Sequence, residues 1–229
     1  HKPFTLKNGI PVHLIPFAGT EAVTVLVLVK VGSRYETVPL NGVSHFIEHL
    51  MFKGTSKYPL GVFSKTIAAV GGQENAFTNY DYTAYFEKIA ASKLPISFEL
   101  EADRMQNLLF DEEEFNREIK IIREERRLRT DDNPQALTFE RYLAAAHLTA
   151  PYHHPVIGWM SDLYQMTVDD VKTWYHRFYA PNNATLVVVG DVNPEEVHQL
   201  AIKYFESIGK HANYSRKAQI EPPNLGPKF

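Results

Sequence analysis

The chain has 229 residues, of which 44% are hydrophobic and 22% charged, and its formal net charge is −3. This composition is typical of a globular protein with a sizeable core, and it excludes a dominant basic patch for nucleic acid. Because the chain has 10 histidines and no cysteine, a metal site would use histidine, carboxylate or carbonyl ligands, and thiol catalysis is excluded. No apolar run approaches the ~18 residues of a membrane span.

Strand patterns begin the chain. Residues 4–6 lead through Asn8-Gly9 into a second extended run at 11–16, which predicts a β-hairpin. Residues 22–31 are almost all β-branched or leucine, so we expect a strand buried on both faces. The proline and glycine residues of 32–42 indicate a loop.

Helical patterns follow, interrupted by one strand pair. Helices are expected at 44–53 and 63–70, and an aromatic- and threonine-rich run at 74–89 predicts two strands joined near residues 79–81. Thr167 and Asn193 are expected N-caps of later helices. The remaining expected elements are helices at 94–109, 112–129, 135–148, 168–179 and 194–208, and a strand at 185–189.

The order of these elements predicts an α+β fold, with a mixed, mostly antiparallel β-sheet covered by α-helices. No composition break divides residues 1–211, so we expect one domain there. Prolines 222, 223 and 227 indicate that residues 212–229 form an extended linker that leads to something beyond the domain.

The segment SHFIEHLMFKGT, residues 44–55, places two histidines and a glutamate in a largely apolar helix. His45 and His49 are four residues apart, so both imidazoles leave the same helix face. Glu48 lies near that face, where a carboxylate could reach a water on the metal. Three protein ligands and a water are typical of catalytic zinc. The five residues alone equally fit helical histidines that hydrogen-bond to backbone or solvent.

A third ligand is expected in the charged helix at 112–129. Glu118 and Glu125 are two turns apart and share a face, and Ile121 and Ile122 lie on or beside it. Unpaired buried carboxylates are costly, and a zinc ion with its histidines would compensate them. The other glutamates of this helix are expected in solvent-facing ion pairs: Glu112, Glu113, Glu114 and Glu124.

Other residues that could suggest a site are interpreted structurally. His153 and His154 lie in a loop between two prolines, and adjacent side chains diverge, so a second metal site is disfavoured there. Trp159 and Trp174 are expected in the core or an interface. The Lys and Arg residues of 117–129 alternate with glutamates, which indicates a solvated helix face.

The run HFIEHLMFKGT closely resembles the H-L-x-E-H-x-x-F-K-G-T signature of the M16 metallopeptidases, a family that includes pitrilysin, insulin-degrading enzyme and the mitochondrial processing peptidase. The family's third zinc ligand is a downstream glutamate, and its spacing corresponds to Glu125, 76 residues after His49. The family's supporting glutamate, seven residues earlier, corresponds to Glu118.

Two further segments extend the resemblance over essentially the whole chain. GGQENAFTNYDYTAYF is similar to the family's G-G-x-x-N-A-x-T run, whose Asn-Ala-x segment binds peptide at an exposed sheet edge. The resemblance therefore implies substrate binding at Asn75, Ala76 and Phe77 through main-chain hydrogen bonds. Residues 181–197 also resemble a family segment.

The resemblance implies a zinc-dependent endopeptidase that acts on extended or unfolded peptides, with one Zn²⁺ per chain. His45, His49 and Glu125 would hold the metal. Glu48 would act as general base on the zinc-bound water, and Glu118 would orient a ligand histidine. Family members contain two homologous halves and this chain matches one, so a second M16-like domain or subunit is an expected partner.

Two alternatives remain at the level of sequence. The chain could be a non-catalytic peptide-binding or assembly subunit, as in the respiratory-complex core proteins that resemble this family, although an intact set of zinc residues argues against this. A metal-binding scaffold without turnover is the third interpretation. The compartment stays open between bacterial periplasm and cytoplasm.

Overall fold

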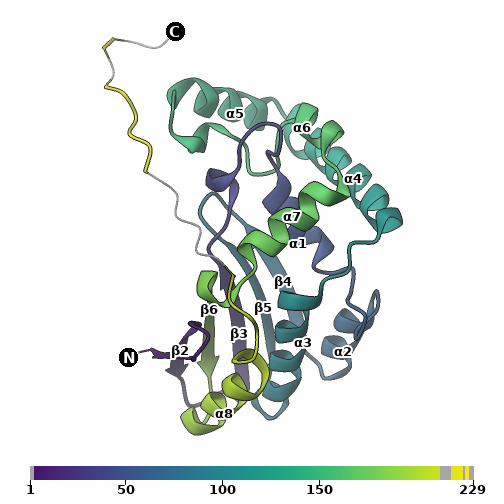
Figure 1. Ribbon diagram of the computed structural model, residues 1–229, viewed down its shortest axis with the longest axis vertical. Helices are drawn as coiled ribbons and strands as arrows, with labels where there is room; N and C mark the ends of the chain where they lie inside the picture. The colour runs from purple at the N-terminus through teal and green to yellow at the C-terminus, as the bar shows by residue number, and fades with distance from the viewer. Residues whose placement is uncertain (1–2, 212–217, 224, 227–229) are drawn as a thin grey trace.

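The structure is a computed structural model that describes residues 3–211, 218–223 and 225–226. Six strands form one sheet in the order β1-β2-β6-β3-β5-β4 (Figure 1). They are β1 Phe4–Thr5, β2 Pro11–Pro16, β3 Ala22–Val29, β4 Gln73–Thr78, β5 Thr83–Ala90 and β6 Ala184–Gly190. Strands β2 and β6 pair in parallel, and the other four pairings are antiparallel. The expected mixed, mostly antiparallel sheet is confirmed.

Local turn chemistry forms both hairpins where the sequence predicted them. Gly9 closes the first with φ of +99°, a conformation that favours glycine. In the second, the Asn79 side chain accepts hydrogen bonds from the backbone N–H groups of Asp81 and Tyr82, at 2.8 and 2.9 Å. This Asx-type turn reverses the chain between β4 and β5.

The helices agree with the expected ones apart from their ends, with one addition. They are α1 Val43–Leu50, α2 Val62–Ala69, α3 Leu94–Asn107, α4 Glu112–Arg126, α5 Pro134–Ala146, α6 Met160–Gln165, α7 Val168–Phe178 and α8 Pro194–Phe205. Thr167 and Asn193 are N-caps of α7 and α8, as expected. Helix α6 was missed because six residues are too few to show a helical period. Helix α4 continues into an unexpected π-helical turn, Arg127–Asp131.

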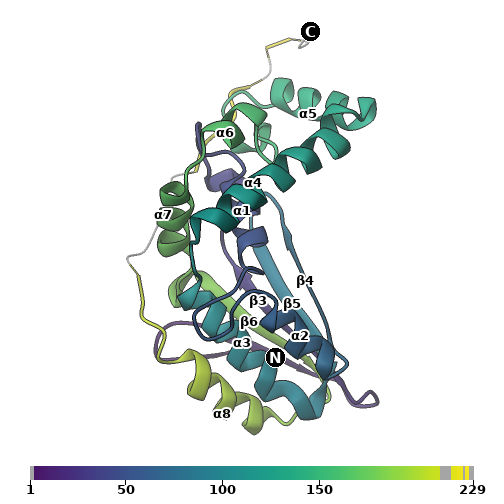
Figure 2. The same ribbon diagram turned by 90° about the vertical axis from the view of Figure 1, so that its right-hand side faces the viewer.

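Helices cover one face of the sheet, as Figure 2 shows for α3, α7 and α8. Strand β3 alternates strictly, with Val23, Val25, Val27 and Val29 buried and the residues between them half-buried. The expectation that this strand is buried on both faces was therefore wrong. Its half-buried face also carries mostly apolar residues, so the alternation between buried and half-buried positions cannot be seen in the sequence.

The buried N-terminus of α1 is held by side chains and backbone from elsewhere in the chain. Its N-cap, Gly42, has φ of +98° and no capping side chain of its own. Instead, the buried Glu36 carboxylate accepts hydrogen bonds from the backbone N–H groups of Gly42 and Ser44, at 2.8 and 2.7 Å. Burial raises the pKa of Glu36 to about 7, and these backbone donors oppose the rise. A carboxylate at this position satisfies free N–H groups and complements the helix dipole.

Helix α4 is joined to the same region by Arg126. Its guanidinium donates to both carboxylate oxygens of Glu140 on α5, at 2.8 Å each, and to the carbonyl oxygen of Gly158 at 2.9 Å. Gly158 in turn lies against the backbone of Asn41 and Gly42, so closely that a Cβ on Gly158 would be 2.3 Å from the Asn41 oxygen. The end of α4 and the start of α1 are thus connected through one short, buried path.

The domain boundary at 211 and the linker at 212–229 remain predictions. Residues 212–217, 224 and 227–229 lie outside the described residues. Where it is described, the tail lies beside the loop after α5, and the Glu221 carboxylate accepts the backbone N–H groups of Leu148, Thr149 and Ala150, at 2.5, 3.1 and 2.8 Å. Among the described residues, no helix is both long and apolar enough to cross a membrane.

The close approach at Gly42 gives a stability test. Gly42→Ala should destabilise the fold by about 2–5 kcal/mol, the sum of left-handed backbone strain and overpacking, because its Cβ would be 2.6 Å from the Ile157 oxygen. Gly61, the N-cap of α2, is a matched control: its φ is +81° and no atom lies within 4 Å of a built Cβ. Gly61→Ala should cost only the strain, about 1–2 kcal/mol. If urea unfolding gave the same loss of unfolding free energy for both variants, the contact between Gly42 and the Ile157 oxygen would not be tight.

Candidate metal centre and active site

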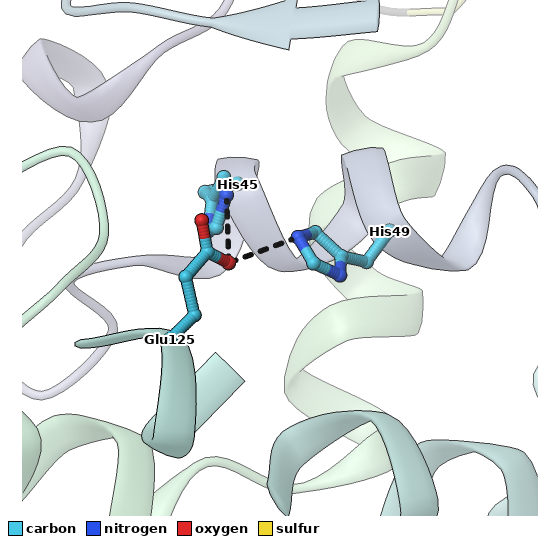
Figure 3. Close-up of side chains that lie close together, drawn as sticks. All are labelled: His45, His49 and Glu125. Carbon is cyan, nitrogen blue, oxygen red and sulfur yellow. Dashed lines mark ion pairs between the residues drawn. The ribbon is translucent and has the colours of Figure 1, made fainter. Parts of the chain in front are cut away.

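The candidate site lies between α1 and α4, and Figure 3 shows its three central side chains converging from the two helices. The Oε2 atom of Glu125 is 3.4 Å from Nε2 of His49 and 3.8 Å from Nε2 of His45. One potential ligand atom from each of the three residues lies within 4.8 Å of the others. The sequence-predicted ligands are therefore brought together.

The spacing of these atoms fits a tetrahedral zinc ion. Two ligand atoms about 2.1 Å from zinc and a tetrahedral angle apart are separated by about 3.4 Å. The two distances from Glu125 fall at and slightly above that value. Within the residues that the structure describes, this is the one group of three that could hold a metal. His153 and His154 are not part of this group.

Glu118 lies behind His49 and contacts its other ring nitrogen. Oε1 of Glu118 is 3.0 Å from Nδ1 of His49, and Oε2 is 2.8 Å from Nζ of Lys53. A carboxylate on Nδ1 fixes the ring orientation and leaves Nε2 directed at Glu125. Glu125 has a similar support, because its Oε1 is 2.9 Å from a guanidinium nitrogen of Arg129 in the π-helical turn.

The two histidines differ in charge state. Burial lowers the pKa of His45 to about 4, and neighbouring His49 lowers it as well, so His45 is neutral as a metal ligand must be. Burial also lowers the pKa of His49, but its hydrogen bonds with Glu118 and Glu125 outweigh burial and raise it to about 9. With this pKa, a proton on His49 balances the two carboxylates. A bound cation would take over that charge.

The pKa values of the two carboxylates, Glu118 and Glu125, are lowered. The hydrogen bond with His49 lowers the pKa of Glu125, against the effect of burial. Burial raises the pKa of Glu118, but hydrogen bonds with His49 and Lys53 outweigh it and the pKa is lowered. Both groups are thus anionic acceptors at neutral pH, the form that binds cations. Nδ1 of His45 is buried, and among the described residues none hydrogen-bonds to it as Glu118 does to Nδ1 of His49.

Glu48 lies near His49 and Glu125 but is not part of the group of three potential ligands. It is half-buried on α1, and the Thr78 hydroxyl at the end of β4 donates to its Oε2 at 2.5 Å. Burial raises the pKa of Glu48, and the Thr78 hydrogen bond lowers it. A carboxylate beside a ligand group but outside it has the placement that a general base requires.

Strand β4 lies at the edge of the sheet and borders the site. It pairs with β5 on one side and is the last strand in the sheet order. Its side chains alternate: Asn75 and Phe77 are exposed, while Ala76 is half-buried and packs against the core. An unpaired strand edge offers main-chain donors and acceptors to another extended chain.

The charged helix matches its prediction in most positions. Glu118 is buried and Glu125 is half-buried on the face towards α1, Ile122 is buried beside them, and Glu124 is exposed. Ile121 was expected on or beside that face, yet it is 48% exposed, because it lies one residue too early in the helical turn. Glu113 and Glu114 both form the expected ion pairs with Arg117, and Glu113 is exposed while Glu114 is half-buried. Trp174 is buried in the core, as expected.

Sequence reasoning assigned no role to four residues that support the site: Lys53, Thr78, Arg126 and Arg129. Two of them carried a signal. Arg129 is four residues after Glu125, the spacing of a helical ion pair, and Thr78 directly follows the segment expected to bind substrate. Arg126 and Lys53 act across long sequence separations, which a local pattern does not reveal.

Comparison with known proteins agrees with this geometry. The insulinase (peptidase family M16) model matches residues 13–158, and the model of the M16 inactive domain matches residues 165–229. The chain is 41% identical to the zinc protease PqqE of Helicobacter pylori over 229 residues, which is all of this chain and 51% of that protein.

Solved structures agree as well. A protease from Helicobacter pylori superposes with a TM-score of 0.92 at 39% identity, covering 96% of this chain and 53% of that one. The first half of the periplasmic protease PqqL from Escherichia coli gives 0.84 at 26% identity, over 96% and 48%. The ferredoxin protease FusC, solved in complex with Arabidopsis ferredoxin, gives 0.85 at 25% identity, over 94% and 25%. The chain spans about half the length of the curated relatives it matches, and it belongs to the M16 (insulinase) peptidase family.

Proposed function

We propose that this chain is the metal-bearing half of a zinc-dependent endopeptidase. The observation that carries the proposal is the convergence of two histidine Nε2 atoms on one glutamate oxygen, at 3.4 and 3.8 Å. Its match to zinc proteases over the whole chain supports the same conclusion. One zinc per chain would be held by His45, His49 and Glu125.

The remaining polar groups have distinct tasks. When bound, zinc supplies Lewis acidity, which polarises a carbonyl group and lowers the pKa of water towards ~7. Glu48 accepts a proton from the attacking water and later donates it to the leaving amine. Glu118 holds the His49 ring through Nδ1, and Lys53 fixes Glu118 by pairing with its second oxygen.

The substrate would be an extended peptide that adds as a strand to β4. The free edge of β4 at Asn75, Ala76 and Phe77 adjoins α1, so a strand added there passes close to Glu48. Affinity would come mainly from main-chain hydrogen bonds, with little sequence preference. A folded protein would have to expose an extended segment to be cleaved.

A second M16-like half would complete the site, either in the same longer chain or as a separate subunit. The chain covers about half of its relatives, and the inactive-domain model matches its residues 165–229. We assign residues 1–211 to the catalytic half and residues 212–229 to a linker towards the second one. The Glu221 contacts would then fix where the linker leaves the domain.

Metal content tests the ligand set. The purified wild type should contain about one zinc per chain, and His49→Ala and Glu125→Gln should each lose it, because two ligands do not make a closed site. Elemental analysis after dialysis gives the ratio. Glu124→Gln is the control, since Glu124 is on the same helix but exposed and paired with Arg127. A wild type without zinc, alone and with the second half added, would contradict the assignment.

The role of Glu118 predicts a graded effect. Glu118→Gln should weaken zinc binding by about 10–100-fold, the usual loss when a residue that orients a ligand is changed. Competition with a chromophoric chelator measures this affinity, and Glu124→Gln again serves as control. An unchanged zinc affinity in Glu118→Gln would mean that Glu118 is not needed to orient His49.

Glu48→Gln separates metal binding from catalysis. The variant should keep its zinc, because Glu48 is outside the ligand group. Its hydrolysis of an unstructured peptide in the presence of the second half should fall by at least about 100-fold, because an amide accepts no proton. Full hydrolysis by zinc-loaded Glu48→Gln would remove Glu48 as the base. A wild-type protein that binds zinc and peptide but never cleaves would instead indicate a binding subunit.

A further inference from the structure

The hydrogen bond from Thr78 to Glu48 connects two parts of the site that the proposed function treats separately. Glu48 is on α1, the helix that carries both histidines, and Thr78 is the last residue of β4, the edge strand. The Thr78 hydroxyl donates to Oε2 of Glu48 at 2.5 Å. The bond spans 30 residues of sequence and joins the candidate base to the candidate substrate strand.

The position of Thr78 in β4 determines which face of the strand its hydroxyl lies on. Side chains alternate along β4, so Thr78 and Ala76 are on the face of the strand towards the core, and Phe77 is on the other. Thr78 pairs with Thr83 of β5, whose own hydroxyl donates to the Val31 oxygen at 2.8 Å. One rung of the ladder thus carries two threonines, one bonded to backbone and one to Glu48.

The Glu48 side chain needs such a restraint. A glutamate has three side-chain torsions, and the last is broad and two-fold, so the helix alone does not fix the direction of its carboxylate. Of the two carboxylate oxygens, the bond from Thr78 engages Oε2, and Oε1 remains for proton transfer. A threonine has a stiff χ1, so the strand sets the position of its hydroxyl closely.

We propose that Thr78 is a positioning residue that holds the Glu48 carboxylate in register with a peptide bound along β4. This inference rests on the proposed function. Thr78 directly follows the segment Asn75–Phe77 on the same strand. The strand therefore fixes the distance between the docked peptide and the hydroxyl that holds Glu48. The hydroxyl therefore serves the catalytic step, and peptide affinity does not depend on it.

Thr78→Val tests the inference, because it removes the hydroxyl and keeps the β-branched shape. With the second half present, kcat for a quenched fluorescent peptide should fall by about 10–100-fold, the scale of a misplaced catalytic group, while KM and zinc content stay unchanged. Binding of the same peptide to the metal-free protein, measured by anisotropy, should also stay unchanged. Thr78→Ser should restore most of kcat.

Thr83→Val is the matched control, since it removes the other hydroxyl of the same rung. It should lower the melting temperature, because a buried bond to the Val31 oxygen is lost, and leave kcat unchanged. Three outcomes would overturn the inference: a wild-type kcat in Thr78→Val, an equal loss of kcat in Thr83→Val, or a loss carried by KM and peptide affinity. Each is read against an active wild type and an inactive Glu48→Gln, so a failure of the proposed function would be recognised separately.

Discussion

The candidate site depends on how firmly α1 is fixed against α4, and one buried path provides this constraint. Arg126 is adjacent to Glu125 on α4, and its guanidinium donates to the Gly158 carbonyl oxygen. Gly158 is in close contact with the backbone of Asn41 and Gly42, where α1 begins. The carboxylates of Glu36 and Asp162 bind the backbone at the same point. Glu125 and the two histidines are therefore connected through one buried set of contacts.

Charge balance explains why such a frame is needed. Glu118 and Glu125 both approach His49, and two carboxylates in a partly buried site repel each other unless a cation lies between them. The proton on His49, together with Lys53 and Arg129 at the outer carboxylate oxygens, supplies positive charge here. A zinc ion held by Nε2 of His49 would replace that proton, because a histidine ligand is neutral.

Periodic patterns and end signals predicted the strands and, in the part of the chain that the structure describes, seven of the eight α-helices, since these depend on residues close in sequence. Helix periodicity offered Glu118 and Glu125 as candidates, and only the family resemblance selected Glu125 as a ligand; the structure brings it together with His45 and His49. The predictions that were wrong concern features that depend on contacts between residues far apart in sequence. The one-sided burial of β3 depends on which face the helices cover, and Ile121 is exposed because the core meets α4 along a narrow strip. The supports from Lys53 and Arg126 could not be predicted either, because each joins segments at least 14 residues apart.

The inverted order of the motif gains a physical explanation from these contacts. Successive residues on a helix are turned by about 100°, so Glu48, one residue before His49, leaves α1 at a different angle from the histidines. The histidines face α4 and Glu125, while Glu48 faces β4 and Thr78. In the order His-Glu-x-x-His the glutamate would take the place of Phe46, two positions earlier and about 200° around the helix, where the side chain is buried in the core. The spacing His-x-x-Glu-His therefore suits a site in which metal and substrate are held by different neighbours of one helix.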